Sequence, residues 1–259
     1  MGLAEQVSAL RDRGFCVVDE VLTPEETSRA RERLWAAARE NEQRGASLHL
    51  PIDRNASNVR VFGLIERDPL FRDLIQHPLA IALVTALLGE NFLISNFTAN
   101  IALPGSQPMK PHSDQGIVVP EPWLAPWSIN IIWCLNDVHE SNGATRYLPL
   151  SHRLTRRDEL PDGYEAMMKP FEAAAGSIIA MDGRLWHTSG ANVTANEERA
   201  MMFGYYSAGF IRPQVNWNAA LSPETLRALP PRLTRWLGVE ETANLALGAH
   251  LVFSDPRQH

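Results

Sequence analysis

The sequence changes its polarity pattern at Phe92, and this change limits the folds that the chain can adopt. From there to residue 101 polar and apolar side chains largely alternate, which is the period of a half-buried strand. One face of this strand would carry Asn96, Thr98 and Asn100, and the opposite face would be apolar. Further strands are predicted where short apolar runs lie near turn-forming residues, at residues 14–18, 128–135, 145–148, 176–181 and 200–207.

Helices are predicted mainly ahead of this region. Thr23, Pro24 and Glu26 mark a helix start, because threonine can cap, proline suits the first turn and glutamate completes a capping box. The helical segments are residues 4–13, 24–44, 68–88 with a break near residues 77–78, and 222–238 with a break at residues 230–231. Residues 47–60 show no clear period. This order predicts an α+β fold with a mainly β core, in which helices pack outside a β-sandwich or barrel.

Composition indicates one globular domain over residues 1–259. Of the 259 residues 45% are hydrophobic and 21% are charged, and the formal net charge is −6. No basic stretch is available for a nucleic-acid partner, and no apolar stretch is long enough to cross a bilayer. Cys16 and Cys134 are expected to be buried free thiols. Residues 1–10 lack a signal-peptide pattern, so the expected location is the cytoplasm, and no heptad pattern indicates an oligomeric state.

Three residues have the types and spacing of a metal site. His112 and Asp114 are separated by one residue, so an extended segment would direct both side chains to the same side, and Pro111 favours such a segment. His187 follows far along the chain, just after a predicted strand, and a jelly-roll fold would bring it close. Two imidazoles and one carboxylate bind Fe(II) on one face and leave coordination positions open for other ligands.

Arg199 and Ser189 extend this hypothesis to a second ligand. A guanidinium can hold a carboxylate in a bidentate pair, and the hydroxyl of Ser189 could contact the same group. Together with the metal, these groups suit the two negative charges of 2-oxoglutarate. The alternatives are a core histidine at His187 and a surface ion pair at Arg199, and a His-x-Asp tripeptide alone is a weak signal. The joint order of the five residues favours the metal site.

The chain resembles the phytanoyl-CoA dioxygenase family of Fe(II)- and 2-oxoglutarate-dependent oxygenases over almost its whole length. The segments that carry the resemblance are residues 14–18 (GFCVV), 21–26 (VLTPEE), 112–114 (HSD), 142–152 (NGATRYLPLSH) and 176–190 (GSIIAMDGRLWHTSG). Leu150 stands where the family usually has glycine. Arg199 lies one residue further from His187 than the commonest spacing, which implies a one-residue loop insertion.

The resemblance implies a double-stranded β-helix, or jelly roll, with flanking N-terminal helices. It implies a metal bound by His112, Asp114 and His187, and cosubstrate contacts from Arg199 and Ser189. One polar residue of the preceding strand is expected to help bind the cosubstrate, and the candidates are Asn96, Thr98 and Asn100. The implied cofactors are Fe(II), 2-oxoglutarate and O2. Related halogenases have a small residue in place of the carboxylate, so Asp114 favours hydroxylation or another oxidation over halogenation.

The expected substrate is a small, hydrophobic or ring-containing metabolite, such as one of secondary metabolism. The predicted substrate contacts are Gln115, Trp123 and Trp127 in the loop after the metal motif, and Phe203 and Tyr205 on the strand that follows Arg199. The alternative for the two tryptophans is that they pack on the core. Residues 153–170 are expected to form a lid. Two other functions remain open at this stage, a non-catalytic jelly-roll protein that binds a ligand and a metal enzyme without a keto-acid cosubstrate.

Overall fold

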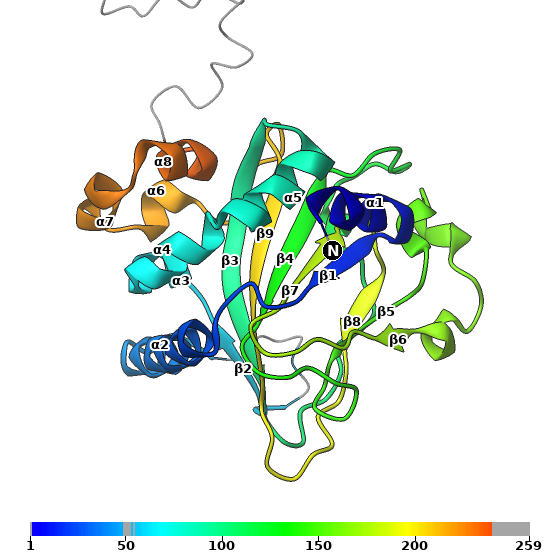
Figure 1. The fold of residues 1–259 in the computed structure, drawn as a ribbon, viewed down its shortest axis with the longest axis horizontal. Helices are drawn as coiled ribbons and strands as arrows, with labels where there is room; N and C mark the ends of the chain where they lie inside the picture. Colours follow the sequence, from blue (N-terminus) through cyan, green and yellow to red (C-terminus); the bar gives the residue numbers. More distant parts are fainter. Residues whose placement is uncertain (1, 49–52, 54, 240–259) are drawn as a thin grey trace, which may run out of the picture.

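Two antiparallel sheets form the centre of the molecule (Figure 1), which is a computed structural model describing residues 2–48, 53 and 55–239. The larger sheet has the order β1-β7-β4-β9-β3-β2 and the smaller one β6-β5-β8. The strands of the larger sheet are β1 (Phe15–Val18), β2 (Asn58–Val61), β3 (Phe92–Ala102), β4 (Ser128–Cys134), β7 (Ile178–Asp182) and β9 (Arg199–Ala208). Those of the smaller sheet are β5 (Thr145–Tyr147), β6 (Lys169–Pro170) and β8 (His187–Ser189).

Helices cover one face of the larger sheet (Figure 1). They are α1 (Leu3–Arg13), α2 (Pro24–Gln43), α3 (Leu64–Arg67), α4 (Pro69–Ile75), α5 (Pro78–Leu88), α6 (Trp217–Ala220), α7 (Pro223–Ala228) and α8 (Pro231–Leu237). The predicted capping box is confirmed, since the hydroxyl of Thr23 accepts from the Glu26 amide and the Glu26 carboxylate accepts from the Thr23 amide. The predicted break before Pro78 separates α4 from α5.

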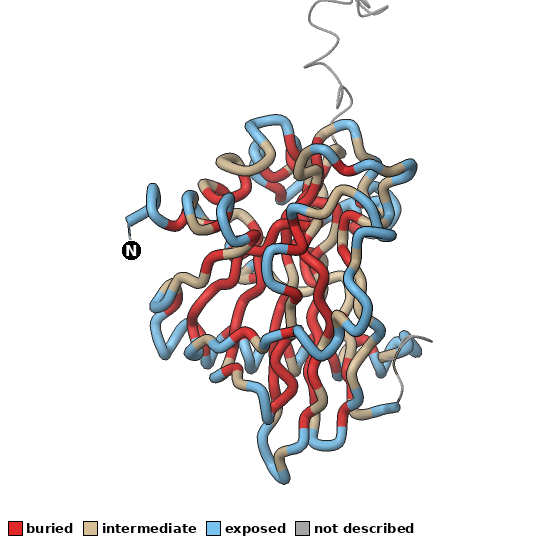
Figure 2. The backbone as a smooth tube through the Cα atoms, turned by 90° about the vertical axis from the view of Figure 1, so that its right-hand side faces the viewer, coloured by how far each residue is buried: buried red, intermediate tan, exposed pale blue. Residues whose placement is uncertain are grey.

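The alternation along β3 places two different environments on the two faces of the larger sheet. Phe97, Ala99 and Ile101 join the main hydrophobic core with the helices. Asn96, Thr98 and Asn100 line a cavity on the opposite face. On that inner face a second apolar cluster joins strands β4, β7 and β9 to the smaller sheet through residues such as Ile132, Met201 and Phe171. Buried residues concentrate along the strands accordingly (Figure 2). The predicted β core with outer helices is therefore confirmed, and two sheets packed face to face form the jelly roll.

Three strands fall where the sequence pattern predicted none, namely β2, β6 and β8. β2 begins in the polar stretch of residues 47–60 and ends at Val61, and it pairs with β3 from Asn58↔Ala102 to Val61↔Ala99. Such a short edge strand forms because its backbone groups are hydrogen-bonded to β3, and it needs no alternation of polar and apolar residues of its own. Its pairing brings Asn58 and Arg60 to the end of the sheet near the cavity. The segment of residues 153–170, expected as a lid, contains three-residue and four-residue 3₁₀ turns and β6.

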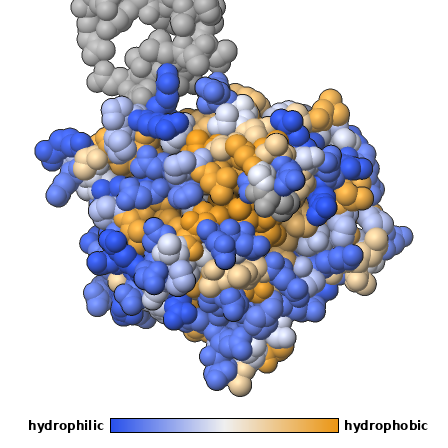
Figure 3. All heavy atoms as spheres, in the orientation of Figure 1, coloured by the Kyte–Doolittle hydropathy of each residue, from blue (hydrophilic) through white to orange (hydrophobic). Residues whose placement is uncertain are grey.

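The two cysteines, the apolar helices and the apolar surface can be compared with what the composition predicted. Cys16 and Cys134 are free and buried as expected, and burial raises their thiol pKa to about 11 and about 12. Within the described residues no single helix is long and apolar enough to cross a membrane, although the bent pair α4 and α5 passes the test together at an angle of 42°. Figure 3 shows apolar residues gathered across the middle of the face that carries α5.

Gly176 provides a test of how the N-terminal segment is joined to the sheet. Its carbonyl accepts from the amides of Val21 and Leu22, its φ is +84°, and an added Cβ would lie 2.5 Å from the Leu22 carbonyl oxygen. We expect Gly176→Ala to lower the free energy of unfolding by more than the roughly 1–2 kcal/mol of left-handed strain alone. Urea unfolding measures this.

Gly45→Ala is the matched control, because Gly45 has φ +74° with no atom within 4 Å of an added Cβ. Equal destabilisation by the two substitutions would contradict the assignment of a backbone contact at Gly176.

Candidate metal and cosubstrate site

Reciprocal backbone hydrogen bonds bring the two predicted histidine ligands together. The amide of His112 donates to the His187 carbonyl at 2.9 Å, and the amide of His187 donates to the His112 carbonyl at 2.8 Å. His187 begins β8, so His112 continues the smaller sheet as an isolated bridge. Residues paired in this way present their side chains on the same face of a sheet. The two imidazole rings have centroids 4.4 Å apart.

Asp114 completes the cluster. One ligand atom from each of His112, Asp114 and His187 lies within 4.8 Å of the others. Asp114 Oδ1 is 3.8 Å from His112 Nε2 and 3.7 Å from His187 Nε2. Asp114 begins a 3₁₀ helix (Asp114–Ile117), so the chain turns immediately after the ligand. The structure therefore brings together the three residues predicted as the metal triad.

Hydrogen bonds on the far side of each ring leave the inner nitrogens available. His112 Nδ1 lies 3.0 Å from the Lys110 carbonyl, and His187 Nδ1 lies 2.9 Å from the Leu185 carbonyl. A carbonyl only accepts, so in the neutral ring Nδ1 carries the proton and Nε2 keeps its lone pair. Burial lowers the pKa of His187, as does the neighbouring His112, which favours the neutral ring that a metal needs.

Asn130 and Tyr205 fix the position of Asp114. Asn130 donates from Nδ2 to Asp114 Oδ2 at 3.0 Å, which leaves Oδ1 facing the histidines. The hydroxyl of Tyr205 donates to the backbone carbonyl of Asp114 at 3.1 Å. Asn130 and Tyr205 lie opposite each other on β4 and β9. Outer hydrogen bonds of this kind orient a ligating carboxylate, so the residues present fit a divalent metal ion.

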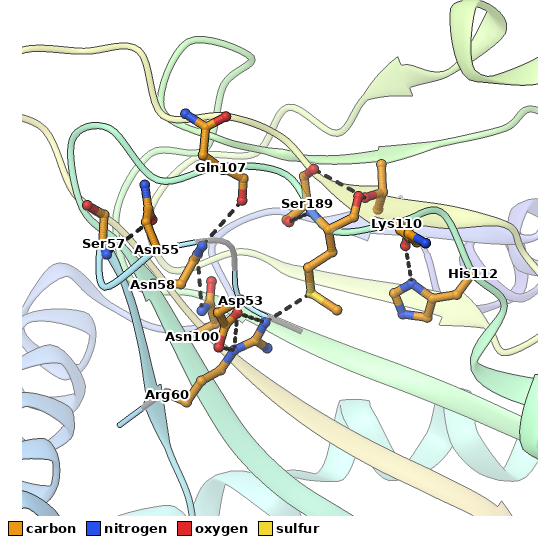
Figure 4. A network of polar contacts seen from close by, with 12 residues as sticks. Asp53, Asn55, Ser57, Asn58, Arg60, Asn100, Gln107, Lys110, His112 and Ser189 are labelled. Atoms are coloured by element: carbon orange, nitrogen blue, oxygen red, sulfur yellow. Dashed lines mark hydrogen bonds and ion pairs between the residues drawn. The ribbon is translucent and has the colours of Figure 1, made fainter. Parts of the chain in front are cut away.

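A cavity of about 180 Å³ extends from the triad along the inner face of the larger sheet. The predicted residues that line it are His112, Asp114, His187, Ser189, Arg199, Asn96, Thr98, Asn100, Phe203 and Tyr205. The Ser189 hydroxyl accepts from the Met109 amide at 3.0 Å (Figure 4). The strand register shows where the lining residues lie along the cavity. Asn96 pairs with Tyr205 near Asp114, whereas Arg199 pairs with Ala102 at the other end of β3.

Arg199 is a buried cation at the closed end of this cavity. The residue is 1% exposed, and its Nη2 donates to Asn100 Oδ1 at 2.8 Å. Burial lowers its pKa to about 10, with a smaller contribution from Arg60, so the side chain stays charged at neutral pH. Among the residues that the structure describes, no carboxylate lies within ion-pair distance of Arg199. A buried charge without a counterion is costly, so the arrangement suits an anionic ligand.

Three predicted substrate residues do not line the cavity. Gln115 is fully buried and its amide binds the loop itself, donating to the Ala125 carbonyl and accepting from the Trp127 amide. Trp123 is 1% exposed and donates to the Val118 carbonyl. Trp127 packs edge-on against the exposed Phe210. These side chains do not face the cavity because the polar groups of Gln115 and Trp123 are hydrogen-bonded within the loop. They therefore stabilise the conformation of the segment after Asp114.

Five other residues line the cavity that the sequence reasoning missed: Arg60, Met109, Asn130, Thr145 and Gln214. Asn130 had a detectable signal, because it is a polar residue inside the apolar run of residues 128–135. Arg60 is held by Asp53 at 2.7 Å and also contacts the Met109 sulfur (Figure 4). Gln214 accepts from Asn96 Nδ2 at 3.1 Å. Arg60 and Gln214 lie outside any motif, so only tertiary contacts bring them here.

Comparisons with known proteins agree with this geometry. The phytanoyl-CoA dioxygenase (PhyH) family model matches residues 10–201. Dioxygenase af480 of Aspergillus fumigatus is 44% identical over 249 residues, which cover 96% of this chain and 81% of that protein.

Two solved structures share the fold. The non-heme alpha ketoglutarate dependent carbocyclase SnoK from nogalamycin biosynthesis has a TM-score of 0.66 and 22% identity, covering 85% of this chain and 90% of its own. The non-heme alpha ketoglutarate dependent epimerase SnoN from the same biosynthesis has a TM-score of 0.63 and 21% identity, covering 83% and 85%. The predicted fold class is thus confirmed. With its family match over most of the chain and its 44% identical relative, this chain belongs to the phytanoyl-CoA dioxygenase family and is an oxygenase.

Proposed function

We propose that the protein is an Fe(II)- and 2-oxoglutarate-dependent dioxygenase that hydroxylates a C–H bond of a small, uncharged, largely apolar metabolite. The observation that carries this proposal is that one cavity holds both the His112–Asp114–His187 cluster and the buried Arg199, which has no carboxylate partner among the described residues. A metal ion would bind the His112–Asp114–His187 cluster, and a dianionic keto acid would bridge from that metal to the charge of Arg199. A ligand-binding protein without catalysis needs neither feature, and a metal enzyme without a keto acid does not need Arg199.

Each residue has a separate task in this mechanism. His112 and His187 would bind the metal through Nε2, and Asp114 through the oxygen that Asn130 leaves free. Arg199 would hold the distal carboxylate of the keto acid, with Ser189 beside it. When bound, the iron and keto acid supply the activation of O2 that oxidises the substrate. The buried strand residues exclude water from this centre. Because Asp114 occupies a ligand position, oxidation is favoured over halogenation.

The substrate side of the cavity supports an uncharged molecule. The charged cavity residues other than the triad are Arg199, assigned to the keto acid, and Arg60, which Asp53 neutralises. The open end carries the Asn96–Gln214 carboxamide pair, and Phe203 and Tyr205 line the wall. A cavity of about 180 Å³ is smaller than typical sites for drug-sized ligands, so the substrate would extend across the mouth. We propose secondary metabolism as the context because SnoK and SnoN come from nogalamycin biosynthesis.

The first test concerns the metal triad. We expect wild-type protein to give the charge-transfer absorption of an Fe(II)–keto acid chelate when Fe(II) and 2-oxoglutarate are added without oxygen. The double variant Asp114→Ala with His187→Ala should lose this band, because two of three protein ligands are removed.

His139→Ala is the control, since that ring is paired with Glu197 outside the cavity. Absence of the band from wild-type protein would count against the function. Its persistence in the double variant would count against the ligand assignment.

The second test concerns the support of Asp114 by Asn130. Asn130→Ala removes the hydrogen bond that orients the carboxylate, so we expect metal affinity to fall roughly 10–100-fold. Calorimetric titration with Mn(II) measures it. Asn41→Ala is the control, because Asn41 is also buried but donates to the Phe62 carbonyl away from the cavity. Equal affinities of the two variants would show that Asn130 does not orient the ligand.

The third test concerns the substrate class. In a library screen that measures succinate formation, we expect uncharged oxygenated ring compounds to stimulate turnover more than carboxylated analogues of the same rings. Gln214→Ala should raise the KM for the responding compound, because it removes one half of the carboxamide pair, and should leave the KM for 2-oxoglutarate unchanged. A preference for the carboxylated analogues would contradict the proposed substrate class.

A further inference from the structure

A chain of hydrogen bonds between buried side chains leads from Arg199 to the edge of the larger sheet. Arg199 Nη2 donates to Asn100 Oδ1 at 2.8 Å, and Asn100 Nδ2 donates to Asn58 Oδ1 at 3.4 Å. Asn58 Nδ2 donates to the Gln107 carbonyl at 3.3 Å. Figure 4 shows Asn58 between Asn100 and Gln107. Arg199, Asn100 and Asn58 belong to β9, β3 and β2, which are adjacent in the sheet. We call these three side chains and the Gln107 carbonyl the relay.

The two ends of this relay fix its direction. A guanidinium can only donate, so the Asn100 amide must turn its oxygen to Arg199 and its nitrogen to Asn58. Asn58 must then accept from Asn100 and donate onward, and the Gln107 carbonyl at the far end can only accept. No member can rotate its amide without breaking two hydrogen bonds. Asn58, Asn100 and Arg199 are 2%, 4% and 1% exposed, so water does not readily replace a lost partner.

The relay orients Arg199 without neutralising it. Asn100 is an uncharged acceptor, whereas the neighbouring Arg60 is bound by the carboxylate of Asp53. The two guanidinium groups therefore differ in their remaining charge, although both line the cavity. The amide of Asn100 has its oxygen bound by Arg199 and its nitrogen bound by Asn58. Asn100 is therefore engaged at both ends by protein groups, and its influence on a ligand would pass through Arg199.

We propose that Asn100 and Asn58 are positioning residues that hold Arg199 in place as a charged, unpaired receptor for the distal carboxylate of the keto acid. This inference rests on the proposed function. It assigns Asn100 a different task from direct cosubstrate binding, which the sequence resemblance implied as one possibility. It also explains why an amide stands at this position, because a carboxylate there would occupy Arg199 in place of the ligand.

Two keto acids and two variants separate positioning from a general loss of structure. 2-Oxoglutarate has a distal carboxylate, and pyruvate has the same metal-binding end without it. Binding of each is titrated anaerobically against the Fe(II)-loaded protein, following the chelate absorption. We expect Asn100→Ala to weaken 2-oxoglutarate binding about tenfold, because a hydrogen bond to a buried charge is lost. Asn100→Asp should weaken it further, since the new carboxylate pairs with Arg199 and competes. Pyruvate binding should change in neither variant.

Asn58→Ala extends the test by one step along the relay. It should weaken 2-oxoglutarate binding less than Asn100→Ala, again without an effect on pyruvate. Asn55→Ala is the control, because Asn55 lies nearby but donates to the Gly105 carbonyl outside the relay. The affinity of each variant for Mn(II) reports whether the metal site is intact.

The proposal is overturned if Asn100→Asp binds 2-oxoglutarate as tightly as wild type, or if both keto acids weaken equally. A wild-type protein that binds pyruvate and 2-oxoglutarate with equal affinity overturns the role of Arg199 itself. A wild-type protein that binds Mn(II) but neither keto acid overturns the proposed function together with this inference. The expected result is a loss specific to 2-oxoglutarate that is larger for aspartate than for alanine.

Discussion

The paired backbone hydrogen bonds between His112 and His187 are the constraint on which the candidate site depends. They join a segment that follows β3 to a strand far along the chain, and they set both imidazoles on one face. Each ring is then oriented by a carbonyl two residues earlier in its own segment. The metal triad is thus largely a result of backbone pairing, and side-chain contacts only refine it. A loss of this pairing would separate the ligands without changing any of them.

The inner face of the larger sheet combines two requirements that oppose each other. An interior must be apolar to stabilise the barrel, and Ile132, Met201 and their neighbours provide this. A cosubstrate site must keep a charge available in the same interior. The sheet meets both requirements by using different strands, because the polar residues of β3 line the cavity whereas apolar residues of β4, β7 and β9 form the second cluster. Arg199, first in β9, lies where the two regions meet.

The sequence predicted the main elements because their signals are local. The alternation along β3, the capping box at Thr23 and the break at Pro78 depend on neighbouring residues, and the structure has all three. The triad could be predicted because its spacing matches a family pattern. β2, Arg60 and Gln214 could not, since pairing with distant residues determines them. Gln115, Trp123 and Trp127 do not line the cavity, because closeness in sequence to Asp114 does not show which way a loop turns its side chains.

Residues of the paired strands and residues of the loops differ in how freely they can change during evolution. The groups assigned to the keto acid lie within hydrogen-bonded strands, where a one-residue slip of β3 against β9 would turn Asn100 to the helix-covered face. The groups at the open end include Gln214, which lies in the loop between β9 and α6. Loop residues tolerate substitution and insertion far better than residues of a central strand. Substrate preference in such a barrel can therefore diverge between relatives through the loops, while the oxidising centre and its cosubstrate stay the same.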